Sequence, residues 1–547
     1  MSRRNFLRAA GTAAVAVELG GCARSGSTSD VRRSDTFSVL NKDVQAVRNY
    51  NAFSPSNHAT PSFGLVYEQL VRLDALHGAR IRPWLASAWE FSDGGRTLTF
   101  TARRGVTFSD GTPMTANDIF YTLQLPLKHA ELTPSGVEYT GVHMVGRDKV
   151  ALTFDEPSYQ NLVECVNVRV VPRHIWQHQD PVKWTNPNPV GTGPTVLQGF
   201  SSQQSTFRRR KGYWGGDLPM EYVRYPCATE DAAKLMLIDG ELDLATIAWP
   251  GATQHYVPKD PRKYRYNPPP AGGSEGVAFN LTTPPWNDVH VRRAMSLAID
   301  RKVVSRVMND GQLPMYVTNL DDRIYRDWIA PEYRGKVQQL DVAGARHELQ
   351  QAGWSVQNGR LVKDGRTHRV SMRFCNDYPA WHIESAVLVD QWRKHLGLDV
   401  ELIAQPGATF FDQVNSGHFD IALWFCGNGT SMYQSYHSIM DPALSVSAGK
   451  VATGNPGRWN DPATKSLLAG MRQTDHEPTL QKLGHQLQKI VVEQVPFVPN
   501  VSGNMWCVIN QSYWTDWPDD RTSKMIAADS GPDLVLMLQQ LKRVNQA

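Results

Sequence analysis

The sequence predicts an α/β fold, with mixed or parallel sheets that carry helices on their faces. Segments with the two-residue period of strands alternate with segments of helical period along most of the chain. The chain has 547 residues, enough for two or more domains. It is 41% hydrophobic and 20% charged, which is ordinary for a globular protein.

The first elements are predicted from the periodicity of apolar residues and from the residues that favour turns and helix caps. Phe63–Leu73 has the apolar period of a helix and ends in strand-like sequence. Thr97–Ala102 alternates between polar and apolar residues, which predicts a strand. Ser109–Pro113 has the composition of a turn, and Thr115 is placed to cap a helix that runs through Leu123.

The middle of the chain continues the alternation. Pro189–Pro194 predicts a rigid turn, and Phe207–Arg210 predicts a strand. Asp231–Asp239 predicts a helix that ends at Gly240, followed by a strand over Asp243–Ile247.

A second α/β block begins near Asp288. We expect helices over Val291–Val307, Leu340–Gly353, Ile383–Leu396 and Phe410–Ser416, and strands over Arg369–Phe374, Val400–Ile403 and Phe419–Phe425. The last stretch, Val498–Ile509, is strand-like again, and we expect it to return to the first block.

The N-terminus has the parts of an export signal: a basic start, a short apolar run and small residues before Cys22. Arg3 and Arg4, followed by Asn-Phe-Leu, resemble a twin-arginine signal, and Leu-Gly-Gly-Cys22 resembles a lipobox, whose cysteine is lipidated. The apolar run is far shorter than the ~20 residues of a membrane-spanning helix. Glu18 departs from the usual pattern, because such signals are apolar there. We expect an exported protein anchored by lipid on Cys22 to the outer face of the cell membrane.

Charge and cysteine usage exclude several classes of protein. The net charge is +4, and the one dense basic run, 208–211, has no broad basic face around it, so we expect no nucleic-acid partner. Six cysteines occur without a C-x-x-C spacing, and five remain after Cys22, so we expect mostly buried thiols and at most one or two disulfides. The 16 histidines are scattered along the chain, so we expect no metal and no other cofactor.

A collinear set of motifs resembles one known family, the family 5 extracellular solute-binding proteins, which serve ATP-binding-cassette importers of peptides, nickel and oligosaccharides. Each motif is weak alone, but together they follow the family order over about residues 37–510. The matching stretches are Tyr67–Val71, Pro83–Trp89, Arg104–Asp118, Pro189–Pro194, Gly212–Gly216, Gly240–Asp243, Phe279–Leu281 and Val291–Arg301.

The resemblance implies a two-lobed periplasmic-binding-protein-like fold, with an extra subdomain in a discontinuous first lobe. The expected division is a signal peptide over 1–22, a tether over 23–36, lobe I over 37–277 with a subdomain at about 71–190, lobe II over 278–502, and a return to lobe I over 503–547. The chain crosses between lobes near 276–280 and 499–505. The implied partners are a permease and an ATPase, and a monomer is expected. The matching motifs themselves look structural, because their glycines and prolines set turns.

Two loops of lobe II are the predicted ligand site, because ligands of open α/β sheets gather after the carboxyl ends of strands. Their glycines let backbone amides approach a ligand, and their aromatic residues offer stacking faces. The predicted contacts are Asn376, Asp377, Tyr378, Trp381 and His382 in the first loop, and Trp424, Gly427, Asn428, Gly429, Thr430, Ser431, Tyr433 and Tyr436 at the second.

The ligand stays open between an oligosaccharide, a peptide and another solute. Peptide binders of the family hold the ligand's ammonium with an aspartate in the second loop, whereas this chain has no acidic residue between Ile421 and Met440. A buried ammonium without a counter-charge is costly, so the neutral loop suits the hydroxyls of a sugar better. Two other functions remain: a sensor without transport, and an exported carbohydrate-active enzyme using Asp377, Glu384, Asp412 or Asp420. We expect no enzyme, because the usual catalytic motifs are absent.

Overall fold

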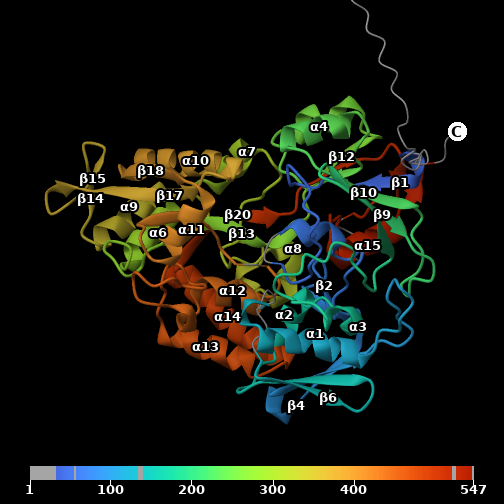
Figure 1. The fold of residues 1–547 in the computed structure, drawn as a ribbon. Helices are drawn as coiled ribbons and strands as arrows, with labels where there is room; N and C mark the ends of the chain where they lie inside the picture. Colours follow the sequence, from blue (N-terminus) through green and yellow to red (C-terminus); the bar gives the residue numbers. More distant parts are fainter. Residues whose placement is uncertain (1–32, 55–56, 133–138, 428, 520–524, 545–547) are drawn as a thin grey trace, which may run out of the picture.

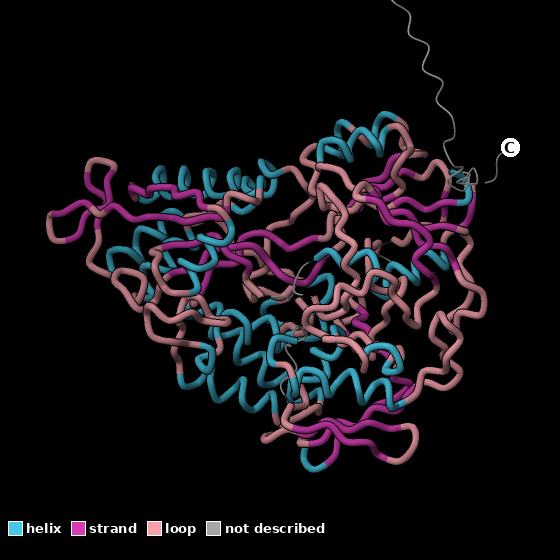
Figure 2. Tube along the Cα trace, in the orientation of Figure 1, coloured by secondary structure: helices cyan, strands magenta, loops and turns pink. Residues whose placement is uncertain are grey.

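The computed structural model describes residues 33–54, 57–132, 139–427, 429–519 and 525–544 (Figure 1). Groups of strands with helices stand on opposite sides of the view, and a smaller group that includes β4 and β6 lies at the bottom (Figures 1 and 2). The fold is therefore α/β and two-lobed, as predicted.

Lobe I is built on two sheets that both ends of the chain share. One sheet has the order β1-β10-β9-β8 and the other β11-β21-β12. Their strands are β1 (Thr36–Ser38), β8 (Thr195–Ser201), β9 (Gln204–Arg209), β10 (Tyr222–Pro226), β11 (Leu244–Ala245), β12 (Tyr264–Asn267) and β21 (Cys507–Asn510). Because β21 pairs with β11 and β12, the strand-like C-terminal stretch does return to the first block.

Three helices complete the main body of lobe I. They are α4 (Glu230–Ile238), α5 (Ala252–His255) and α15 (Gly531–Gln540). Helix α4 begins at the Thr229 cap and ends beside Gly240, close to the predicted bounds. A short ribbon, β22 (Trp514–Thr515) with β23 (Lys542–Arg543), lies at the chain end, and Arg543 pairs with Asp35 at 2.7 Å. The end of the described chain therefore lies beside its beginning (Figure 1).

A separate antiparallel sheet with one long helix forms a subdomain within lobe I, which we call the β4–β7 unit. Its strands are β4 (Ala86–Ser92), β5 (Thr97–Ala102), β6 (Gly141–Val145) and β7 (Lys149–Thr153), and its helix is α1 (Ala116–Lys128). Thr115 caps α1 together with Asp118, and β5 has the bounds that the alternation predicted. The short elements β2 (Val71–Asp74), β3 (Arg80–Pro83), α2 (Asn161–Glu164) and α3 (Arg173–Trp176) lie around this unit.

The helix expected over Phe63–Leu73 is wrong. The chain there forms turns and an isolated bridge between Phe63 and Tyr67, with Gly64 at a φ of 79°. The backbone carbonyls of Leu65 and Val66 accept bonds from residues 195 and 193 instead of from a following helical turn. Tertiary hydrogen bonds therefore replace the local ones that the period predicted.

Lobe II is built on a mixed five-stranded sheet of order β18-β17-β19-β13-β20. Its strands are β13 (Pro270–Phe279), β17 (Arg369–Cys375), β18 (Asp399–Gln405), β19 (Ile421–Phe425) and β20 (Phe497–Asn504). Strands β18 and β19 are parallel to β17, whereas β13 is antiparallel to both of its neighbours. A small sheet lies at the edge of the lobe: β14 (Ser355–Gln357), β15 (Arg360–Lys363) and β16 (Arg366–Thr367).

Helices pack around this sheet and over a second core next to it. They are α6 (Val289–Leu297), α7 (Arg301–Met308), α8 (Asp322–Tyr325), α9 (Val342–Gln351), α10 (Pro379–Leu396), α11 (Gly407–Asn415), α12 (Met432–Met440), α13 (Pro462–Arg472) and α14 (Glu477–Gln494). The single helix expected over Val291–Val307 is two helices, because the Asp300 side chain accepts from the amides of Lys302 and Val303 and starts α7. Such capping ends one helix and begins the next.

Two short crossings join the lobes. Residues 268–269 connect β12 to β13, and residues 505–506 connect β20 to β21. Figure 1 shows β13 and β20 side by side near the middle of the molecule, and they pair as antiparallel neighbours. Residues 276–280, where the sequence places the first crossing, lie at the end of β13, which pairs with β19 inside the sheet of lobe II. Lobe I thus comprises the described residues before 268 and after 506, and lobe II those from 270 to 504.

Candidate functional site

The two predicted ligand loops meet at one edge of the lobe II sheet. Strands β17 and β19 are parallel neighbours, so the loops that follow them leave the sheet at the same end. The ring of Tyr378, after β17, lies 5.7 Å from the ring of Phe425, the last residue of β19. The structure therefore brings the two loops together.

Three aromatic rings form what we call the aromatic platform: Tyr378, Trp381 and Phe425. The Trp381 ring lies 5.0 Å from Tyr378 and 4.9 Å from Phe425. Tyr378 is 37% exposed and Phe425 is 41% exposed, whereas Trp381 is 1% exposed. Tyr378 and Phe425 therefore offer ring faces to a ligand, and Trp381 supports them from beneath.

Phe425 is a candidate site residue that is absent from the predicted contacts, because the sequence analysis treats it only as the last residue of a strand. It is the last residue of β19, and its side chain is exposed at that end of the strand. A large apolar residue at the carboxyl end of a strand, before a glycine-rich loop, is the signal that could have found it.

Trp381 and His382 were expected on a loop, but they lie in the first turn of α10. The helix begins at Pro379, which suits the first helical position because proline lacks a backbone N–H there. The Trp381 ring turns inward, packs 5.8 Å from Phe410 and donates from Nε1 to Glu275 Oε2 at 3.0 Å. His382 points outward and is exposed.

The polar residues of the first loop are exposed, with one structural role. Asp377 Oδ2 accepts from the backbone N–H of Gly407 at 3.0 Å, at the start of α11. The carbonyl oxygen of Asn376 lies 3.3 Å from His382 Nε2. The amide side chain of Asn376 is open to solvent, so it can still bond to a ligand.

The second loop starts α12 and is held close to β13, the strand that follows the first crossing between the lobes. The Oγ of Ser431 caps α12 by accepting from the backbone of Gln434 at 3.0 Å. A Cβ on Gly272 in β13 would lie 2.7 Å from the carbonyl oxygen of Gly429, so both positions need glycine. Tyr325 donates its hydroxyl hydrogen to that same carbonyl.

The remaining aromatic residues of the second loop lie inside the lobe. Tyr436 is fully buried and donates to the carbonyl of Thr318 at 2.7 Å. Tyr433 is 4% exposed and stacks on His437 at 5.1 Å. Trp424 packs against Phe410 and Phe411, while Gly427 and Thr430 are half-buried. Asn428, Arg3, Arg4 and Cys22 lie outside the described residues.

A cavity of about 160 Å³ lies between two parts of lobe I, the β2–β3 hairpin and the α2 segment, and the helices of lobe II. Its size matches an engineered cavity of ~150 Å³ that binds benzene. Its lining is mostly apolar and comes from Gly78, Ala79, Ile81, Tyr159, Gln160, Leu162 and Val163 of lobe I and from Trp328, Ser431, Met432, Tyr433, Met471 and Leu480 of lobe II. The lobe I residues were not predicted, and no motif in the sequence marks them.

Polar contacts hold the lobes together beside this cavity. The backbone N–H of Tyr159 donates to the carbonyl of Arg472 at 3.1 Å, and Gln160 Nε2 donates to the carbonyl of Met471 at 3.1 Å. Gln434 donates its amide hydrogen to Glu164, whose pKa burial raises. These contacts join the two lobes, so moving the lobes apart would break them.

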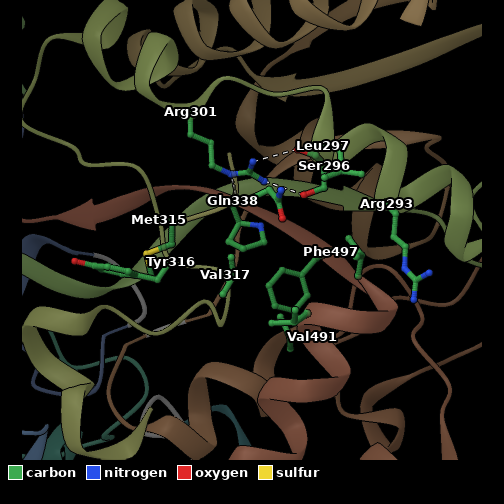
Figure 3. Close-up of a pocket in the computed structure, with 13 residues that line it drawn as sticks. Arg293, Ser296, Leu297, Arg301, Met315, Tyr316, Val317, Gln338, Val491 and Phe497 are labelled. Carbon is green, nitrogen blue, oxygen red and sulfur yellow. Dashed lines mark hydrogen bonds between the residues drawn. The ribbon is translucent and has the colours of Figure 1, made fainter. Parts of the chain in front are cut away.

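A second cavity of about 160 Å³ lies within lobe II alone (Figure 3). Arg301 reaches into its wall, where it donates to the carbonyls of Pro499 and Ser296 and to the Ser296 hydroxyl. Burial lowers the pKa of this guanidinium to about 10. The Arg301 guanidinium is therefore occupied by bonds within the protein. Because no lobe I residue lines this cavity, it does not lie between the lobes.

Three further observations concern the described part of the chain. All five of its cysteines are free, so no disulfide joins them. No group of three His, Cys, Asp or Glu side chains there could hold a metal ion. No helix among those described is long and apolar enough to span a bilayer.

Comparison with known sequences finds relatives along most of the chain. The model for bacterial extracellular solute-binding proteins, family 5, matches residues 80–449, more than half of the chain. The periplasmic murein peptide-binding protein MppA of Escherichia coli K12 is 26% identical over 500 residues, which cover 84% of this chain and 88% of that protein. The nickel-binding periplasmic protein of the same organism is 24% identical over 464 residues, covering 80% of this chain and 83% of that protein.

Comparison with solved structures finds the same fold. A periplasmic oligopeptide-binding protein of an oligopeptide ABC transporter from Thermotoga maritima superposes with a TM-score of 0.84 at 22% identity, over 94% of this chain and 100% of that chain. Its mannohexaose-bound form gives a TM-score of 0.75 at 21% identity, over 94% and 99%. The predicted family is confirmed, and its members here are binding proteins of transporters rather than enzymes. The chain belongs to the bacterial extracellular solute-binding proteins of family 5.

Proposed function

We propose that this protein is the lipid-anchored receptor of an ATP-binding-cassette importer, which captures an extended polar solute between its two lobes. The observation that carries the proposal is the pair of exposed rings, Tyr378 and Phe425, at the carboxyl end of the lobe II sheet. Rings at this position can stack on a sugar ring or a peptide side chain. Closure of the lobes over the solute buries these rings and presents a new surface to the permease.

The proposed ligand is an oligosaccharide or an oligopeptide, with the oligosaccharide favoured. The stretch from Ile421 to Met440 holds no acidic residue to pair with an ammonium group. Two similar proteins support both classes: one is a murein peptide-binding protein, and the other has a mannohexaose-bound structure.

A thermal-shift screen tests the ligand class. The chain from Cys22 onward, with Cys22→Ser to prevent lipidation, is mixed with cello-, xylo-, chito- and manno-oligosaccharides and with di- to pentapeptides. A ligand at 100 times its Kd adds about 2.7 kcal/mol of stability. We expect a shift with one class, which Phe425→Ala and Tyr378→Ala abolish.

The matched control is Leu402→Ala, because Leu402 is also 37% exposed and lies in β18 of the same sheet. This variant should keep the full shift. A ligand whose shift survives both platform variants would overturn the proposed site, and no shift with any sugar or peptide would overturn the proposed ligand classes.

The anchor is tested separately. Cys22→Ser should move the protein from the membrane fraction to the soluble exported fraction, and replacing Arg3 and Arg4 together with Lys should block export. A Cys22→Ser variant that stays with the membrane would refute the lipid anchor, whatever the ligand.

A further inference from the structure

Two carboxyl side chains lie together inside lobe II, near the two crossings between the lobes. Glu275 is in β13, five residues after the start of that strand, and Glu384 is in α10. They are 5% and 0% exposed, and their side chains lie close enough to share a hydrogen bond. Two adjacent carboxylates cannot both ionise in a dry site, so at least one of them keeps its proton.

The neighbouring donors show where that proton sits. Glu275 accepts from Trp381 Nε1, and the side chain of Gln312 lies beside it. Glu384 Oε1 accepts from Asn500 of β20, while no donor from the described residues reaches Glu384 Oε2. A proton on Oε2 that is donated to Glu275 satisfies this buried atom, which would otherwise be left without a partner.

The surroundings keep the proton bound. The other titratable groups that act on the pair are Asp310 after α7, Cys426 after β19 and Tyr378 before α10. None of these is a cation, and neither glutamate forms an ion pair within the described chain. Burial raises the pKa of Glu275 to about 7, and burial with the charge of Glu275 raises that of Glu384 well above its usual range.

The two glutamates lie between the strands that carry the interlobe crossings and the aromatic platform. Glu275 lies in the strand that follows the crossing at 268–269, and Asn500 lies in the strand that precedes the other crossing. Trp381, the ring that supports Tyr378 and Phe425, donates to Glu275. A change in the charge of the pair therefore acts directly on the ring beneath the proposed ligand.

We propose that Glu275 and Glu384 share a proton and, through it, position Trp381, so that the aromatic platform changes with pH. Both are positioning residues, because neither reaches the exposed face of the platform. The carboxyl pair itself does not depend on the ligand, whereas its effect on binding rests on the function proposed above.

The test of the pair needs no ligand. The protein is labelled with 5-fluorotryptophan, and the ¹⁹F resonance of Trp381 is assigned with Trp381→Phe. In the wild type this resonance should shift between pH 5.5 and 8.5, as Glu275 loses or gains charge. In Glu384→Gln an amide N–H replaces the shared proton as donor to Glu275, so Glu275 still titrates and the shift should remain, whereas in Glu275→Gln the titrating acceptor is gone and the shift should disappear.

The control is Glu401→Gln, an exposed carboxylate in the same sheet, which should titrate like the wild type. A Trp381 resonance that does not move in the wild type, or that moves equally in Glu275→Gln, would overturn the proposal. Unfolding gives a second readout. Because both acids have raised pKa values, the folded state binds extra protons above pH ~4.5, so the unfolding constant should rise with pH by up to about tenfold per unit for each proton.

Binding tests the link to the platform. With mannohexaose and tetra-alanine as probes, the Kd should be at least about threefold lower at pH 8.5 than at pH 5.5, because a charged acceptor holds Trp381 roughly twice as strongly as a neutral one. Glu275→Gln should reduce this ratio towards one. An equal Kd at both pH values in the wild type would refute the positioning role. If neither probe binds while the resonance titrates, the proposed ligand classes fail and the proton pair stands.

Discussion

Glu68 is a buried residue whose carboxyl links the β4–β7 unit to the main body of lobe I. We predict that its removal destabilises the lobe. Glu68 is fully buried, and Trp84 Nε1 and the Tyr213 hydroxyl donate to its Oε1 at 2.9 and 2.6 Å. Trp214 Nε1 donates to its Oε2 at 2.9 Å. Trp84 enters the β4–β7 unit, whereas Tyr213 and Trp214 follow β9, so one carboxyl joins two parts of the lobe.

The expected loss follows from these three bonds. A buried donor left without its partner costs about 1–3 kcal/mol, so Glu68→Ala should destabilise lobe I by roughly 5 kcal/mol. Glu68→Gln keeps an acceptor for two donors but turns an amide N–H towards Trp214, and it should cost about 2 kcal/mol. Since whole proteins are stable by about 5–15 kcal/mol, the alanine variant should be close to unfolding locally.

Hydrogen exchange of the β4–β7 unit, together with urea unfolding, measures this loss. The amides of β4, β5 and β7 should exchange far faster in Glu68→Ala, while those of the lobe II sheet should keep their protection. The control is Glu90→Ala, since Glu90 is 62% exposed in its ion pair with Lys149 and such pairs contribute about 0–1 kcal/mol. If Glu68→Ala changes hydrogen exchange no more than Glu90→Ala does, the bonds to Glu68 do not stabilise the lobe and the prediction is refuted.

Four further predictions concern the platform, the turns, the thiols and the interlobe contacts. Trp381→Ala should lower the free energy of unfolding by about 3–5 kcal/mol, because the ring is 1% exposed, and a loss under 1 kcal/mol in urea unfolding would contradict this. Gly193→Ala should reduce soluble yield and melting temperature, because a Cβ there would overlap the carbonyl of Leu65, whereas Gly199→Ala, with open space around it, should be near neutral. Reducing agent should leave the melting temperature unchanged, because the five described cysteines are free, and a drop of several degrees would reveal a disulfide. Gln160→Ala removes the bond to the Met471 carbonyl, so small-angle scattering should report a more open molecule with unchanged unfolding, and an unchanged radius of gyration would count against a role in closure.

Local signals predicted those elements whose ends depend on nearby side chains. Thr115 with Asp118 marks the start of α1, and the alternation over Thr97–Ala102 marks β5 with both bounds right. Asp300 is a capping residue of the same kind, and it divides the single predicted helix into α6 and α7. The helical period over the whole stretch predicted one helix instead. At Phe63–Leu73 the period misled, because carbonyls there bond to the distant turn around Gly193.

The sequence by itself determined the α/β class and the family, because motif order and period are properties of neighbouring residues, and it predicted two ligand loops from their place after strands. It could not determine which rings of those loops face solvent. Trp381 turns inward to Glu275 and Phe410, while Phe425 stays 41% exposed at the end of its strand. It also gave no sign that Gln160 and Tyr159 would meet α13, or that Glu275 and Glu384 would meet each other. Exposure and such contacts join residues far apart in the chain, and only the packing of the lobes decides them.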